Sequence, residues 1–192
     1  GGPSVVQTVA DAGKRVFLDL KLHDIPRTVA RAVASASRLR VDLMTLHAAG
    51  GRAMIAAAAQ AARDCPPGQR PRLLAVTMLT SLEQADLDDL GVGRGMADQV
   101  AALARLALEA GADGVVCSPR EVGRLRALLP PGALLVTPGV RPAGAALGDQ
   151  KRVATPADAV RDGATHLVVG RPVLDAPDPA AAARAILAEM RV

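Results

Sequence analysis

The sequence has no Trp, no Tyr and a single Phe in 192 residues, although half of its residues are apolar. A core of the size expected for this length must therefore be built from Ala, Val and Leu. Proteins that bind single-stranded nucleic acid stack the bases on aromatic rings, and this chain lacks such a set. The Arg residues behind its net charge of +4 are scattered rather than clustered. We expect no nucleic-acid partner, whereas a small anion such as a phosphate ester suits the positive charge.

Cysteine and long apolar runs are also scarce. Cys65 and Cys117 stand far apart and form no CxxC pair, so the sequence predicts no disulfide framework and a reducing, cytoplasmic location. Cys117 follows the apolar residues 114–116 and is predicted to be a small core residue. No apolar run approaches the roughly 18 residues of a membrane span, and no signal-peptide pattern opens the chain. We therefore expect no membrane partner.

Short apolar runs alternate with helical patterns along the chain. Strands are predicted at residues 16–21, 41–47, 72–78, 113–117, 133–137 and 166–170. Helices are predicted at residues 4–13, 26–39, 51–63, 96–110, 119–129, 156–163 and 179–190. Near-continuous apolar strands fit a parallel sheet that is covered on both faces. No linker or change of composition marks a second domain, so we predict a single α/β domain over residues 1–192.

Six strand–helix units fit two architectures. One is a doubly wound sheet, and the other is a (β/α)₈ barrel of the TIM type with units missing. A complete barrel typically needs about 250 residues, so on this interpretation the first two strands are absent. The helix ends support the borders of the units. Residues 118–121 form a capping box, Thr155 and Asp178 each precede a Pro, and Gly111 and Gly163 stand where helices should stop.

Charged side chains interrupt the first predicted strand. In an extended strand Phe17, Asp19 and Lys21 point to one face, and Asp24 follows just past the strand end. An acid and an ammonium on an otherwise apolar strand are costly to bury unless they are paired. Two interpretations are open. The charges form a structural ion pair in the interior, or they belong to an active site, which the third charge, Asp24, favours.

In a barrel the active site lies at the carboxyl ends of the strands, and polar residues gather at these predicted ends. They are Thr45 and His47, Thr77 with Thr80 and Ser81, Thr137 with Arg141, and Gly170 with Arg171. Structural roles compete with this interpretation, because Asp24 could cap the helix near Pro26 and Ser81 could cap a helix near Gln84. For His47 we predict a hydrogen-bonded structural role, because no second His or Cys follows at metal-ligand spacing. We interpret His23 and His166 in the same way.

The segment between Thr137 and Thr155 has no convincing helix or strand pattern, and loops of this length are often lids. It contains Arg141, Gln150 and further charged residues among Gly and Ala. Gly170 and Arg171 end the next strand. Loops after the last two strands of a barrel are the usual phosphate site, where backbone N–H groups and an Arg hold the dianion. The sequence therefore predicts a cationic lid beside a phosphate-binding cradle.

Taken together, these motifs resemble the orotidine 5′-phosphate decarboxylase family, and its bacterial branch in particular. Residues 19–26 are similar to its DxKxxDI signature, although sugar-phosphate decarboxylases and synthases of the same superfamily share the DxKxxD part. The resemblance covers essentially the whole chain in family order. It continues through residues 46–51, 76–81, 114–118, 137–142, 148–150 and 170–172.

The resemblance implies a homodimeric (β/α)₈ enzyme that converts orotidine 5′-monophosphate to UMP and CO₂ in pyrimidine biosynthesis, without metal or organic cofactor. It implies that Lys21 donates the proton to C6 and that Asp19 lies beside the departing carboxylate. Asp24, Ile25 and Thr28 are implied to reach the site of the partner subunit. The remaining implied substrate contacts are Thr80 and Ser81 near the base, and Arg141, Gln150, Gly170 and Arg171 at the phosphate.

Elementary electrostatics agrees with these implied roles. Loss of CO₂ leaves a carbanion that water stabilises poorly, and an ammonium held between carboxylates offers both charge stabilisation and a proton. The remote phosphate supplies binding energy that can be directed to the reacting end. Two other functions stay open. One is a metal-dependent sugar-phosphate decarboxylase or synthase of the same superfamily, and the other is an inactive phosphate-binding barrel fragment.

The resemblance also implies a missing part. Members of the family carry an Asp on the first strand and a Lys on the second, and neither has a counterpart before Asp19, because Lys14 ends a predicted helix. We expect residue 1 to follow the second strand directly and the open barrel to expose apolar edges. The isolated 192-residue chain is therefore predicted to be unstable or inactive, whereas the full-length product is the enzyme. Strong turnover of orotidylate by this chain alone would contradict that prediction.

Overall fold

A computed structural model describes residues 2–142 and 154–191 of the chain. Its contacts divide the chain into two compact units, which are described separately below. The first unit comprises residues 1–77 and 103–115, and the second comprises residues 78–102 and 116–192. Within the described ranges, no helix is both long enough and apolar enough to cross a membrane.

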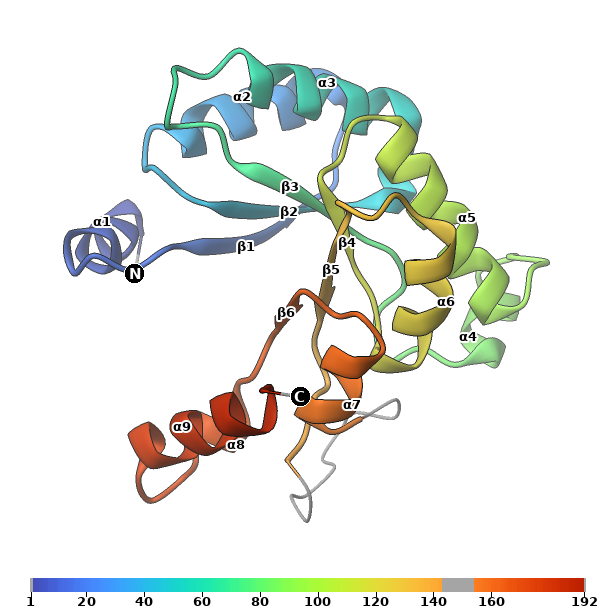
Figure 1. The fold of residues 1–192 in the computed structure, drawn as a ribbon. Coiled ribbons are helices and arrows are strands. Elements are labelled where there is room, and N and C mark those ends of the chain that lie inside the picture. Colours follow the sequence, from blue (N-terminus) through green and yellow to red (C-terminus); the bar gives the residue numbers. More distant parts are fainter. Residues whose placement is uncertain (1, 143–153, 192) are drawn as a thin grey trace. The chain divides into compact units, whose positions relative to one another are not determined.

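The structure has the predicted α/β architecture, with six strands in the described residues (Figure 1). The strand order follows the chain order from β1 to β6, and the pairs β1–β2, β2–β3 and β5–β6 are parallel. In a doubly wound sheet the order reverses at a switch point, so the observed order favours the barrel-type alternative with six βα units. The strands are β1 (Phe17–Leu22), β2 (Leu43–His47), β3 (Arg72–Val76), β4 (Gly114–Val116), β5 (Leu134–Thr137) and β6 (His166–Leu167).

Helical segments lie between the strands, and all seven predicted helices are present. The α-helices are α1 (Pro3–Asp11), α2 (Pro26–Ser37), α3 (Gly51–Arg63), α4 (Gln84–Asp89), α5 (Met96–Glu109), α6 (Val122–Leu128), α7 (Pro156–Arg161), α8 (Arg171–Leu174) and α9 (Pro179–Glu189). Two 3₁₀ turns, η1 (Ala48–Gly50) and η2 (Pro119–Glu121), precede α3 and α6. The predicted ranges did not include α4 and α8, which are short and give too few residues for a clear period, although a helix near Gln84 was considered as one that Ser81 could cap.

The first unit has its core between a helix pair and the sheet. The side chains of β2 and β3 are almost all buried, as the near-continuous apolar runs predicted. The helices α2 and α3 pack side by side and lie along one face of these strands (Figure 1). The buried side chains of α2 and α3 are mostly aliphatic, from Ala and Val to Met54 and Ile55, in keeping with a chain that has no Trp or Tyr and only one Phe. By contrast, β1 has no fully buried residue, so its charged side chains are open to solvent.

The predicted helix borders depend on local hydrogen bonds that the structure contains. The capping box at residues 118–121 is present, with the Ser118 N–H donating to the Glu121 carboxylate at 2.7 Å. The side chains of Thr155 and Asp178 accept N–H groups at the starts of α7 and α9. Gly111 and Gly163 follow α5 and α7 with positive φ, as predicted for helix ends. The predicted core position of Cys117 is also confirmed, since this residue is buried.

Two structural alternatives of the sequence analysis are wrong. Helix α4 begins at Gln84, but its capping box is formed by Glu83 and Asp86, so Ser81 does not cap it. Helix α2 has Ile25 at its N-cap position and no side-chain cap, so Asp24 does not cap α2 in the usual way. In both cases the helix begins one or two residues later than a cap by the predicted polar residue would require, so another residue occupies the N-cap position.

Candidate active site

The pairing of β1 with β2 is irregular where the charged residues occur. Leu18 pairs with Met44, whereas Leu22 pairs with Leu46. Three residues of β1 therefore lie opposite Thr45, where a regular ladder would have a single one. Extra residues in one strand form a bulge, which bends the strand and redirects its side chains. The bulge sits at the carboxyl end of β1, where a barrel enzyme would need its reactive groups.

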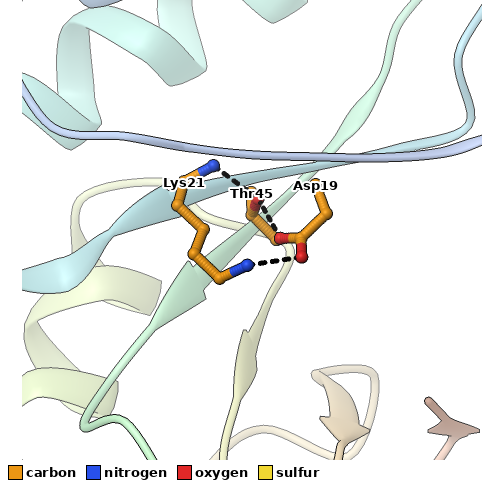
Figure 2. A network of polar contacts seen from close by, with 3 residues as sticks. All are labelled: Asp19, Lys21 and Thr45. Atoms are coloured by element: carbon orange, nitrogen blue, oxygen red, sulfur yellow. Dashed lines mark hydrogen bonds and ion pairs between the residues drawn. The ribbon is translucent and has the colours of Figure 1, made fainter. Parts of the chain in front are cut away.

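Lys21 adopts an uncommon backbone conformation inside this bulge. Its φ angle is 49°, in the left-handed region that residues other than Gly rarely enter. The backbone N–H of Lys21 donates to Oγ1 of Thr45 at 2.9 Å instead of joining a regular strand ladder. The same hydroxyl donates to Oδ1 of Asp19 at 2.8 Å (Figure 2). Thr45 is 1% exposed, so this polar junction lies at the buried side of the bulge.

The side chains of Asp19 and Lys21 meet, as the alternation along the strand predicted. Nζ of Lys21 lies 2.5 Å from Oδ2 of Asp19 (Figure 2). The side chains are 47% and 43% exposed, respectively. The interpretation as an ion pair buried in the interior is therefore wrong for this structure, because both groups are open to solvent. A charged pair that is held at a strand end and remains accessible is suited to contact a ligand.

Two histidines lie beside this pair. The ring centroids of His23 and His47 are 5.3 Å apart, with a tilt of 34° between the rings. Burial lowers the pKa of His47, and the nearby positive charges of His23 and Lys21 lower it further, while Asp19 opposes the shift. A neutral imidazole is therefore favoured at this position. The contact between the rings of His47 and His23 was not predicted from the sequence. The hydrogen-bonded structural role of His47 stays a prediction.

Asp24 and Ile25 lie in the turn between β1 and α2. Oδ1 of Asp24 accepts the backbone N–H of Ile25 at 2.6 Å, so within the described chain the carboxylate binds its neighbour rather than Lys21. Ile25 is 66% exposed. Thr28 lies one turn into α2, is also exposed, and donates its N–H to the Ile25 carbonyl. The three residues thus form one exposed surface at the start of α2.

The second unit contains the other predicted substrate contacts. Thr80 is half-buried and Ser81 is exposed, and both lie in the turn that leads to α4. Arg141 is buried, at 8% exposure, and its Nη1 donates to the carbonyl of Val140 at 2.9 Å. Its backbone is held by a parallel bridge between Val140 and Ala154.

Gly170 and Arg171 lie at the start of the four-residue helix α8, and both are exposed. The carbonyl of Gly170 accepts the N–H groups of Val173 and Leu174, which close the turn. The predicted contact Gln150 lies outside the described residues. Thr137, at the end of β5, is fully buried, and its hydroxyl has no hydrogen-bond partner among the residues that the structure describes.

Three comparisons with known proteins agree with each other. The sequence profile of the orotidine 5′-phosphate decarboxylase / HUMPS family matches residues 1–186. An orotidine 5′-phosphate decarboxylase from Anaeromyxobacter sp. (strain K) is 59% identical over 187 residues, which are 97% of this chain and 80% of the relative. The enzyme of that name from Opitutus terrae is 55% identical over 190 residues, which are 99% of this chain and 82% of the relative. This chain belongs to the orotidine 5′-phosphate decarboxylase / HUMPS family.

The fold supports the same family assignment. The crystal structure of an orotidine 5′-phosphate decarboxylase from Lactobacillus acidophilus matches with a TM-score of 0.88 and 40% identity. The match covers all of this chain and 82% of the other. An identity of 40% is well above the level at which only a fold is shared, so this match supports the family as well as the fold. The assignment agrees with the family that the sequence motifs resemble.

The role of Thr45 in holding Asp19 and Lys21 was not predicted from the sequence. The sequence analysis placed Thr45 among the polar strand ends and assigned it no partner, whereas the structure shows that it binds both Asp19 and Lys21. The signal for this role is weak, since a Thr in an apolar strand is common. Among the described residues, no group of three His, Cys, Asp or Glu side chains could hold a metal ion.

Proposed function

We propose that this protein is an orotidine 5′-phosphate decarboxylase that converts orotidine 5′-monophosphate to UMP and CO₂ in pyrimidine biosynthesis. The observation that carries the proposal is the exposed Asp19–Lys21 pair at the end of β1, in a chain whose compared relatives bear that enzyme name. Asp19 and Lys21, the first two charged residues of the family signature, are the ones that meet at the bulge.

In the proposed reaction, Lys21 is the proton donor. The bond between C6 and the carboxylate carbon breaks, CO₂ leaves, and the electron pair stays on C6. The proton then moves from Nζ of Lys21 to C6, and the amine regains a proton from water. Asp19 holds the ammonium at 2.5 Å in the free protein, so the positive charge is in place before the negative charge develops. Fixed charges of this kind stabilise a transition state without reorganising when the reaction occurs.

Further substrate-binding roles are proposed for residues of the second unit. Thr80 and Ser81 contact the base in this proposal, and Arg141, Gln150, Gly170 and Arg171 hold the phosphate. Support comes from the exposed start of α8, where Gly170 and Arg171 present a cationic side chain beside free space for a ligand around the glycine. A dianion held by Arg and backbone N–H groups supplies binding energy that the reacting end can use. The proposal treats residues 1–192 as one domain, in line with the profile match over residues 1–186.

The proposal includes a homodimer. Asp24, Ile25 and Thr28 form an exposed surface next to the Asp19–Lys21 pair, and Ile25 exposes an apolar side chain there. In this proposal, the exposed side chain of Ile25 is the apolar contact with the partner subunit. In the dimer, Asp24 and Ile25 reach the site of the partner subunit, so that Asp24 is the second carboxylate near Lys21. We also place the protein in the cytoplasm, since both of its cysteines are free thiols.

The decisive experiment is an assay of the full-length protein with orotidine 5′-monophosphate in the presence of EDTA. Loss of the orotate absorbance and formation of UMP are expected, and the chelator should not slow the reaction. The rival function, a metal-dependent sugar-phosphate decarboxylase or synthase, predicts no turnover of orotidylate and a loss of its own activity with EDTA. A purely structural or phosphate-binding protein would turn over neither substrate, and UMP would raise the melting temperature only of the phosphate-binding one.

A further inference from the structure

One hydroxyl joins the backbone of Lys21 to the side chain of Asp19. Oγ1 of Thr45 accepts the Lys21 N–H at 2.9 Å and donates its own proton to Oδ1 of Asp19 at 2.8 Å. The other carboxylate oxygen, Oδ2, binds Nζ of Lys21 (Figure 2). We propose that Thr45 is a positioning residue for the decarboxylation, which it supports by holding Lys21 and Asp19 in their reactive arrangement. This inference rests on the proposed function.

The direction of each hydrogen bond makes the role specific to a hydroxyl. A hydroxyl has one proton to donate and lone pairs with which to accept. Its proton goes to Asp19, which as an ionised carboxylate can only accept, and a lone pair takes the N–H of Lys21. A valine at residue 45 would have almost the same shape but could make neither bond. A serine would keep both bonds and lose only a methyl group.

The backbone of Lys21 needs this support. A non-glycine residue in the left-handed region is strained, and Lys21 has a φ of 49°. The bulge also removes the Lys21 N–H from the regular ladder with β2, and a partly buried donor without a partner would destabilise this backbone conformation further. Thr45 supplies that partner from the opposite strand, and its own burial at 1% exposure leaves the hydroxyl little freedom to turn away.

Loss of the hydroxyl should therefore affect the reaction more than substrate binding. The phosphate contacts proposed for orotidylate do not involve Thr45, so binding energy from that end should remain. A displacement of the reacting group by about 1 Å costs roughly a hundredfold in rate. For Thr45→Val we expect kcat to fall about a hundredfold, with KM changed less than about threefold. For Thr45→Ser we expect kcat within about fivefold of the wild type.

Thr165→Val is a matched control for the general effect of exchanging Thr for Val. The hydroxyl of Thr165 also bridges two groups across neighbouring strands, since it accepts the N–H of Leu135 and donates to the Leu135 carbonyl, each at 3.0 Å. Thr165 lies outside the proposed substrate contacts. Its replacement should lower the melting temperature and leave kcat within about twofold. An equal loss of kcat in Thr165→Val and Thr45→Val would overturn the positioning role.

A second measurement does not depend on activity or on the folding of a variant. Amide hydrogen exchange of the wild-type protein, observed by NMR, should show strong protection of the Lys21 N–H, although the Lys21 side chain is 43% exposed. Each of three results would overturn the inference. They are rapid exchange of the Lys21 N–H, an unchanged kcat in Thr45→Val, and a kcat of Thr45→Ser as low as that of Thr45→Val. Protection at Lys21 in a protein without orotidylate turnover would instead refute the proposed function while leaving the hydrogen bond to Thr45 intact.

Discussion

Nζ of Lys21 lies 2.5 Å from Oδ2 of Asp19 at the end of β1, and both side chains are almost half exposed. A pair of opposite charges in this setting contributes little to stability, because water screens it. Its accessibility and its support by Thr45 point instead to chemistry.

Replacement of the proposed proton donor should abolish turnover without abolishing binding. For Lys21→Ala we expect the decarboxylation rate to fall by about a hundredfold to ten-thousandfold, because general acid catalysis typically contributes 10² to 10⁴. UMP should still raise the melting temperature, since the proposed phosphate contacts remain. Lys14→Ala is the control, because Lys14 is exposed after α1 and outside the site. An active Lys21→Ala variant would rule out the assigned donor.

Mixed dimers can show whether Asp24 acts across a subunit interface. Lys21→Ala and Asp24→Ala should each be nearly inactive alone. After exchange of subunits at equal concentrations, half of the dimers are mixed, and each mixed dimer has one site with an intact Lys21 and an intact Asp24. The mixture should therefore recover about a quarter of the wild-type activity. No recovery, together with subunit exchange verified by mass spectrometry, would show that Asp24 serves the site of its own chain.

The stability of the protein should decrease in mild acid through His47. The pKa of His47 in the folded protein is below its ordinary value of 6.5, mainly because of burial. The neutral imidazole is therefore favoured by folding, and its contribution is complete above 6.5 and is lost as the pH falls through the folded pKa. Between about pH 7.5 and pH 5.5, the free energy of unfolding should decrease more in the wild type than in His47→Gln.

An NMR titration of the His47 ring gives a direct measure of the same shift. Its midpoint should lie below 6.5, the ordinary value for histidine. A midpoint at or above that value, or an equal pH dependence of stability in His47→Gln, would mean that the protonated ring is tolerated beside His23 and Lys21.

Replacement of Gly111 should destabilise the first unit. Its φ is 101°, and a Cβ at this position would lie 2.9 Å from Cβ of Ala59 on α3. Gly111→Ala therefore combines backbone strain with overpacking, and we expect a loss of about 2–4 kcal/mol in the free energy of unfolding. Gly132→Ala is the matched control, because a Cβ there meets nothing within 4 Å. Chemical denaturation of both variants tests the difference.

Local patterns determined much of the fold before any tertiary information was available. The near-continuous apolar runs of β2 and β3 and the caps at Ser118, Thr155 and Asp178 are visible in the sequence, because they depend on neighbours within a few residues. The same holds for Gly111, whose place after α5 follows from the need for a positive φ. The choice between a doubly wound sheet and a barrel-type order was not local, and the strand order decided it.

The sequence alone determined which side chains carry charge at the end of β1, because Asp19, Lys21 and Asp24 interrupt an apolar strand. It could not determine how they are held. The strand bulge, the left-handed backbone of Lys21 and the junction at Thr45 depend on the register between β1 and β2, and register is set by the packing of residues that are far apart in the chain. Tertiary structure therefore decided that the charged pair is exposed and held by Thr45 rather than buried in the interior.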